Sequence, residues 1–152
     1  MHHRIAATVL ATGTAAATLF AASPASAASV APSVHITEIY YNSPGKDTRS
    51  NSSLNAEWVR IKNSTSRAVN LRNWTLTDAS RHQYKFGSYT LGAGKSVKVR
   101  TGRGGDTAAN RYQDRRAYVW NNDRDTATLR KSNGSKADSC SYSNSRRASV
   151  LC

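Results

Sequence analysis

The sequence predicts an all-β domain, a sandwich or barrel built from about eight short strands. Three observations lead to this prediction. Apolar and polar residues alternate in short segments, which is typical of strands with one buried face. Clusters of Gly, Pro, Asn and Asp separate these segments, at the spacing of roughly 8 to 12 residues that is common in sandwiches and barrels. Apolar residues at helical spacing are hard to find.

The first 27 residues have the three-part layout of a secretory signal peptide. Arg4 and the amino terminus form a basic start, an apolar stretch follows, and small residues lead up to Ala27. The apolar stretch is too short and too weakly hydrophobic to span a bilayer, so we expect cleavage after Ala27 and no transmembrane segment. The alternative, a packed N-terminal helix, would have only scattered threonines for its polar face.

Residues 28–32 read as a short linker, and residues 33–152 as a single domain. Removing 27 of the 152 residues leaves 125, which is enough for one domain with a proper core. Without Arg4 the mature chain has 21 Lys and Arg against 9 Asp and Glu, a formal charge of +12. Such a charge concentrates polyanions near the protein surface.

The two cysteines, Cys140 and Cys152, both fall in the mature chain. An exported protein meets an oxidising environment, where an even pair of cysteines is expected to form a disulfide. Their spacing does not suit zinc, which binds close Cys pairs together with further ligands. Intermolecular pairing through Cys152 is the minor alternative.

Two strands are predicted early in the domain, at residues 34–41 and 57–63. A polar loop, residues 46–55, is predicted between them. In the second strand Val59 and Ile61 share one face. The opposite face carries Trp58, Arg60 and Lys62.

The alternation of apolar and polar residues changes phase after the strand at residues 57–63. Two apolar residues before Arg72 and two after Asn73 lie on opposite parities, so a bend or bulge near Arg72–Asn73 is needed to bring all four into one core. Residues 102–116 are predicted to form a long basic loop. The further predicted strands are residues 83–86, 89–91, 96–101, 117–120, 126–130 and 137–142.

Several motifs occur in a characteristic order between about residues 33 and 142. They include Glu57-Trp-Val-Arg-Ile-Lys-Asn63, Val69-x-Leu-x-x-Trp-x-Leu-x-Asp78 and Asp125-Thr-Ala-x-Leu129. This pattern resembles the lamin-tail domain. The resemblance implies an immunoglobulin-like β-sandwich without catalysis, a binding or structural module that also occurs in secreted bacterial proteins. It also implies that Trp74 is a core aromatic residue. Many relatives carry an acid after the Trp-Val pair, where this chain has Arg60 and Lys62.

No set of residues in the sequence has the spacing of a catalytic or metal site, so we expect no enzyme activity and no cofactor. A small secreted hydrolase or nuclease is the remaining catalytic alternative. Glu38 and Glu57 would form either an acid/base pair or, as we favour, cross-strand ion pairs with Arg60, Arg72 or Lys62. His35 and His82 are expected to face solvent or to form hydrogen bonds.

The loop acids Asp123 and Asp125 give a weak indication of calcium binding. A cap on the strand that begins at Thr126 is the favoured role for Asp125, because Asp side chains bond nearby backbone amides.

Positive charge is the strongest functional signal, and Arg outnumbers Lys by 14 to 7 in the mature chain, which favours bidentate contacts to phosphate or carboxylate. The predicted anion-binding residues are Arg60, Lys62, Lys98, Arg100, Arg103, Arg111, Arg115, Arg116, Arg130 and Lys131. Trp58 is a possible aromatic contact, although a half-buried ring shielded by residues 46–55 is favoured.

We expect a secreted monomer that contacts anionic polymers such as extracellular nucleic acid, wall polymer or acidic polysaccharide. The alternative is a module that binds an extracellular protein, with incidental positive charge.

Overall fold

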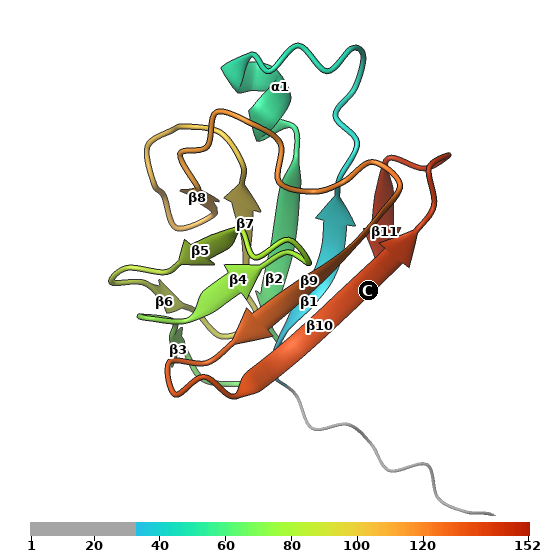
Figure 1. The fold of residues 1–152 in the computed structure, drawn as a ribbon. Coiled ribbons are helices and arrows are strands. Elements are labelled where there is room, and N and C mark those ends of the chain that lie inside the picture. The colour runs from blue at the N-terminus through green and yellow to red at the C-terminus, as the bar shows by residue number, and fades with distance from the viewer. Residues whose placement is uncertain (1–32) are drawn as a thin grey trace, which may run out of the picture. The chain divides into compact units, whose positions relative to one another are not determined.

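The computed structural model describes residues 33–152, and the predicted signal peptide and linker lie outside the described residues. Two main sheets face each other (Figure 1). The larger sheet has the strand order β11-β1-β2-β7-β8. Its strands are β1 (Val34–Tyr40), β2 (Trp58–Asn63), β7 (Ser96–Arg100), β8 (Asn110–Tyr112) and β11 (Ser149–Leu151). Neighbours in this sheet are antiparallel except for β7 and β8, which are parallel.

The second sheet has the order β10-β9-β4-β5, and all of its neighbouring strands are antiparallel. Its strands are β4 (Thr75–Thr77), β5 (Gln83–Lys85), β9 (Arg124–Arg130) and β10 (Lys136–Ser143). A two-stranded ribbon pairs β3 (Val69–Asn70) with β6 (Thr90–Leu91). The single described helix, α1 (Asn51–Asn55), lies above one end of β2 (Figure 1).

The core lies between the two main sheets and confirms the predicted alternation. From the five-stranded sheet, Val59 and Ile61 point inward and are fully buried, while Arg60 between them faces outward. From the second sheet, Leu76 and Leu129 pack into the same cluster. An all-β sandwich with one core is therefore the fold that the sequence predicted.

A bend joins the ribbon to the second sheet at the predicted place. Asn73 has a left-handed φ of 65°, a conformation that Asn tolerates better than most residues. The amide of Asn73 donates to the Phe86 carbonyl oxygen at 2.9 Å. Because of this bend, Trp74 and Leu76 both reach the core and are almost fully buried. The core assignment of Trp74 is confirmed.

The predicted strand at Ala117–Trp120 is wrong. Val119 and Trp120 are buried as in a strand, but the segment has no strand pairing. The Val119 amide donates instead to the carboxylate of Glu57, at 2.8 Å. Val119 and Trp120 are apolar because they are buried, although this segment does not pair with a neighbouring strand.

Three further elements differ from the prediction. The predicted polar loop at 46–55 contains α1, which begins where the Ser53 amide donates to Ser50 Oγ at 3.3 Å and which buries Leu54. The predicted basic loop at 102–116 contains β8. The terminal strand β11 has no clear alternation of its own, and it brings the number of strands within residues 33–152 to eleven instead of about eight.

The predicted intrachain disulfide is present between Cys140 and Cys152, whose Cα atoms are 5.9 Å apart. It joins β10 of the second sheet to the residue that follows β11 of the first. Nearby, the Ile36 amide donates to Asp138 Oδ2 at 2.7 Å, at the bulge in β1. These two links tie the sheets together along one side.

No helix within residues 33–152 is long and apolar enough to cross a membrane.

Candidate anion-binding surface

Two rows of side chains cross the outer face of the five-stranded sheet. The register of the strands places Glu38, Arg60, Lys98 and Asn110 side by side in one row. The next row, closer to α1, is Tyr40, Trp58, Arg100 and Tyr112. The strand pattern predicted that the basic residues face outward, and the register now shows that they are neighbours.

The Trp58 ring lies beneath the side chains of Arg60 and Lys98 on this face. The ring stacks on Tyr40 with centroids 5.4 Å apart. The Nζ atom of Lys98 lies 4.0 Å from the Trp58 ring centroid, and the guanidinium carbon of Arg60 lies 5.0 Å from it. Such cation–π contacts hold a charge over the ring face. Trp58 is only 8% exposed, so it supports the basic residues and offers little ring surface of its own. The ring stacks on Tyr40 and carries Arg60 and Lys98 over its face.

The cations of the face are only partly neutralised. Arg60 forms the predicted cross-strand ion pair with Glu38, at 3.1 Å. Arg100 is held by neutral acceptors, because its Nε donates to Asn110 Oδ1 at 2.8 Å and its Nη1 to the Asn55 carbonyl oxygen at 2.7 Å. Within residues 33–152, the side chain of Lys98 forms no hydrogen bond and no ion pair, whereas its backbone amide donates to the Ala109 carbonyl oxygen at 2.9 Å. Burial, and then the charges of Arg100 and Arg60, lower the pKa of Lys98. We name Arg60, Lys98 and Arg100 the sheet-face cluster.

Three other predicted residues meet at a second place. Arg103, Arg115 and Arg116 line a pocket of about 290 Å³ beside α1, together with Arg49, Asn51 and Leu54. Arg49 was not among the predicted residues; it lies in the predicted polar loop and has a left-handed φ of 55°. Asn55 connects the two groups, because it accepts from Arg100 through its carbonyl oxygen and donates from Nδ2 to the Arg103 carbonyl oxygen at 2.9 Å.

The remaining candidates do not join either group. Arg111 forms an ion pair with Asp106 at 3.0 Å and lies 4.0 Å from the Tyr89 ring centroid. Arg130 ends β9 in the second sheet and Lys131 follows it, away from α1 (Figure 1). Lys62 is exposed near the far end of β2, where it pairs in register with His35 and Ser96. The predicted set therefore splits, and six of the ten residues form the two groups beside α1 and on the sheet face.

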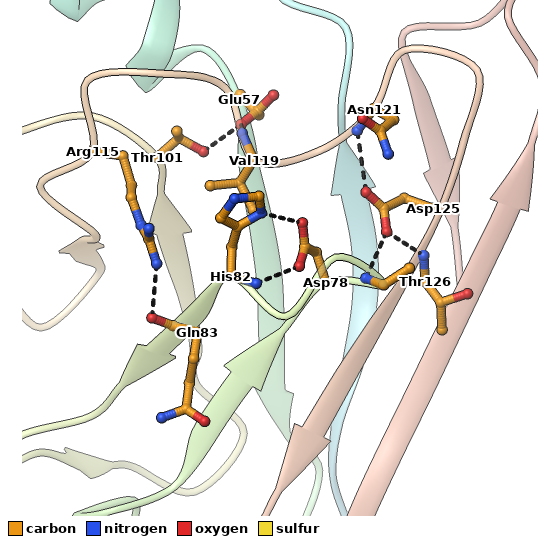
Figure 2. Close-up of polar contacts among 11 residues, drawn as sticks. Glu57, Asp78, His82, Gln83, Thr101, Arg115, Val119, Asn121, Asp125 and Thr126 are labelled. Atoms are coloured by element: carbon orange, nitrogen blue, oxygen red, sulfur yellow. Dashed lines mark hydrogen bonds and ion pairs between the residues drawn. The ribbon is translucent and has the colours of Figure 1, made fainter.

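The carboxylates are used differently from what the sequence suggested, as Figure 2 shows. Glu57 is fully buried and accepts from Thr101 Oγ1 at 2.5 Å and from the Val119 amide at 2.8 Å. Burial raises the pKa of Glu57 to about 7, although these two hydrogen bonds lower it. The predicted ion pairing is thus right for Glu38 and wrong for Glu57, and the two do not form an acid/base pair.

Asp78 and Asp125 are also buried and bind loop backbone (Figure 2). Asp125 accepts from the amides of Thr126 at 2.7 Å, Ala79 at 2.9 Å and Asn121 at 3.2 Å, which confirms its capping role. Asp78 accepts from the His82 amide at 2.6 Å and lies 2.7 Å from its ring Nδ1. These two carboxylates hold loops in place, and within residues 33–152 neither forms an ion pair with an arginine.

The oxygens of Asp125 are therefore engaged with backbone amides, and Asp123 contacts Arg124 at 3.5 Å. Across residues 33–152 there is no group of three or more His, Cys, Asp or Glu side chains that could hold a metal ion. The structure thus lends no support to calcium binding at this loop.

A comparison with known protein families adds to this description of the fold. The family described as Lamin Tail Domain matches residues 27–144. The chain belongs to the lamin tail domain family. This family has an immunoglobulin-like fold, and its members are generally non-catalytic modules. A comparison with curated proteins gives no match for this lamin tail domain.

Proposed function

We propose that this lamin tail domain is a secreted, non-catalytic module that binds anionic polymers through the outer face of its five-stranded sheet. The observation that carries the proposal is the sheet-face cluster, in which three cations from two adjacent strands have one ion pair among them, between Arg60 and Glu38. Like charges opposite each other destabilise a sheet, so an anion that contacts Lys98 and Arg100 would relieve that repulsion.

The wider charge distribution supports the same proposal. Of the 22 Lys and Arg in the chain, all but Arg4 lie within residues 33–152. Within that range, only Arg60, Arg111 and Arg124 form ion pairs with acidic side chains. The polymers that fit are nucleic acid, phosphate-rich wall polymer and acidic polysaccharide. The disulfide suits an oxidising compartment, and together with the signal peptide pattern it supports secretion.

The proposal is tested by measuring the affinity for a short DNA duplex and for heparin at several salt concentrations, by fluorescence anisotropy. For DNA, log K should fall linearly with log salt, by about 0.9 per phosphate neutralised. The double variant Lys98→Gln with Arg100→Gln should bind more weakly and reduce the magnitude of the slope by about 1.8.

The matched control is Arg130→Gln with Lys131→Gln, which removes the same charge from the other sheet. This control should retain most of the affinity and of the slope. If both double variants weaken binding equally, binding depends on the total positive charge of the protein and not on the sheet-face cluster. A salt response that is flat for DNA and heparin alike would reject the proposal and favour the protein-binding alternative.

A further inference from the structure

The pocket beside α1 gathers four arginines from three separate segments of the chain. Arg49 lies in the segment before α1, Arg103 follows β7, and Arg115 and Arg116 follow β8. None of the four is among the ion pairs found in residues 33–152. No acidic side chain lines the pocket. Four arginine residues thus line one hollow, and no acidic residue is among its lining residues within the described part of the chain.

The backbone around Arg103 is held by the helix. The Arg103 amide donates to Asn51 Oδ1 at 2.7 Å, and the Arg103 carbonyl oxygen accepts from Nδ2 of both Asn51 and Asn55, each at 2.9 Å. Gly102 makes this arrangement feasible. A Cβ atom at position 102 would come within 2.6 Å of Asn55 Oδ1 and 2.7 Å of Asn51 Oδ1. Any larger residue there would displace the two asparagines that position Arg103.

The other walls of the pocket are also fixed. The Arg115 amide donates to the Thr101 carbonyl oxygen at 3.0 Å, and Arg115 Nη2 donates to the Gln83 carbonyl oxygen at 3.1 Å (Figure 2). The Arg49 amide contacts the hydroxyl oxygen of Tyr118 at 3.3 Å, and that hydroxyl lies 2.7 Å from Ser53 Oγ of α1. Three segments are thus attached to the helix or to strand ends before any ligand binds, which reduces the ordering cost of binding.

The arginines that line the pocket indicate which kind of ligand it binds. Guanidinium groups bind oxyanions through paired N–H donors, and arginine is preferred where phosphate is recognised in this way. Four positive charges favour a phosphate group that carries up to two negative charges. A volume of about 290 Å³ corresponds to roughly ten water molecules at about 30 Å³ each. That space is large enough for a phosphate group together with several water molecules.

We infer that the pocket lined by Arg49, Arg103, Arg115 and Arg116 is a binding site for a phosphate group. This inference rests on the proposed function and deepens it, because the site lies next to the sheet-face cluster through Asn55. A polymer that crosses Lys98 and Arg100 would place one of its phosphates in the pocket. The phosphate belongs either to the diester backbone or to a monoester at a chain end.

The first experiment uses pyrophosphate and inorganic phosphate as probes, with the mature protein in isothermal titration calorimetry at constant ionic strength. Saturable binding at one site is expected. The double variant Arg103→Gln with Arg116→Gln should weaken it at least roughly tenfold, because it removes two charged hydrogen-bond donors. The control Arg130→Gln with Lys131→Gln should bind like wild type. If pyrophosphate does not bind, or if all of these proteins bind it equally, the inference is overturned.

A second variant tests whether the positioning of Arg103 matters. Gly102→Ala keeps all four arginines but displaces Asn51 or Asn55, so it should weaken pyrophosphate binding while the far-ultraviolet circular dichroism stays that of the wild type. The amide resonances of Arg103 and Arg115 should shift on titration in the wild type. Wild-type affinity in Gly102→Ala, together with unshifted amides in the wild type, would contradict the proposed site.

Oligonucleotides with a 5′-phosphate or a 5′-hydroxyl distinguish the two sources of phosphate. If the 5′-phosphate raises affinity in the wild type and not in Arg103→Gln with Arg116→Gln, the pocket receives a monoester end. If both oligonucleotides bind alike and the variant weakens both, it receives a diester. If the variant changes neither affinity, the polymer does not reach the pocket, and the link between the pocket and polymer binding is rejected.

The two proposals fail in different ways. Pyrophosphate binding without salt-dependent polymer binding would reject the proposed function and leave the pocket as a small-anion site. Polymer binding without pyrophosphate binding would reject only the pocket.

Discussion

The buried carboxyl of Glu57 should make the stability of the domain depend on pH. Its pKa rises from 4.5 to about 7 on folding, mainly because of burial. The folded state therefore favours the protonated form. Since the folded pKa is the higher one, the stabilisation is fully present below about pH 4.5 and is lost as the pH rises through about 7. At 1.36 kcal/mol per pKa unit, the difference between the two limits is about 3 kcal/mol.

The variant Glu57→Gln tests this reasoning, because glutamine keeps an oxygen for the Thr101 and Val119 hydrogen bonds but does not ionise. Urea unfolding of both proteins between pH 4 and pH 8.5 gives two free energies of unfolding at each pH. Their difference cancels the titration of the other groups. It should shift in favour of the glutamine variant by about 3 kcal/mol from the lowest to the highest pH.

A matched control is Glu38→Gln, which removes a carboxyl from the sheet surface and should retain the pH dependence that comes from Glu57. If the wild type and Glu57→Gln gave parallel curves over the whole range, the carboxyl would have the same proton affinity in both states. The argument from burial would then be refuted.

Three further predictions concern stability. Replacing Cys140 and Cys152 with Ser should lower the free energy of unfolding by about 3 kcal/mol for a loop of this length; the wild type in reductant should match the variant in urea unfolding, and an unchanged midpoint would contradict the estimate. Asn73→Ala should cost about 1 to 2 kcal/mol because of the left-handed backbone, whereas Asn73→Gly should not, and equal melting temperatures for the two would exclude backbone strain. Leu129→Ala, at a fully buried core position, should cost about 2 to 5 kcal/mol in chemical unfolding, and a loss below 1 kcal/mol would mean that the core repacks around the gap.

The face of each strand was predictable, because inward and outward positions alternate with a period of two. Val59 and Ile61 were assigned to the core and Arg60 to the surface on this basis. The phase change at Asn73 was predictable for the same reason. The false strand at Ala117–Trp120 shows where this reasoning fails: alternation reports burial, and the backbone partner of Val119 is a carboxylate that lies far away in the sequence.

The site was predictable as a set of residue types but not as an arrangement. The strand pattern places Arg60 and Lys98 on the outer face, but only the register of β2 and β7 shows that they are neighbours. Arg111 looked equivalent to the other loop arginines, and its pairing with Asp106 depends on the fold of that loop. Arg49 was not among the predicted residues, because its place in the pocket depends on how three loops meet at α1.

The covalent link between the two main sheets lies on one side of the sandwich. On one side the Cys140–Cys152 bond and the Asp138 carboxylate fasten β10 to the strands of the larger sheet. On the opposite side lie the short strands β5 and β8 (Figure 1), and Arg115 reaches across to the Gln83 carbonyl oxygen. Local opening concentrates where buried contacts and links between elements are few. We therefore expect the two sheets to separate transiently on the side of β5 and β8, where Arg115 lies. An anion bound beside Arg115 would strengthen the contacts between the sheets on this side, and binding should reduce local opening there.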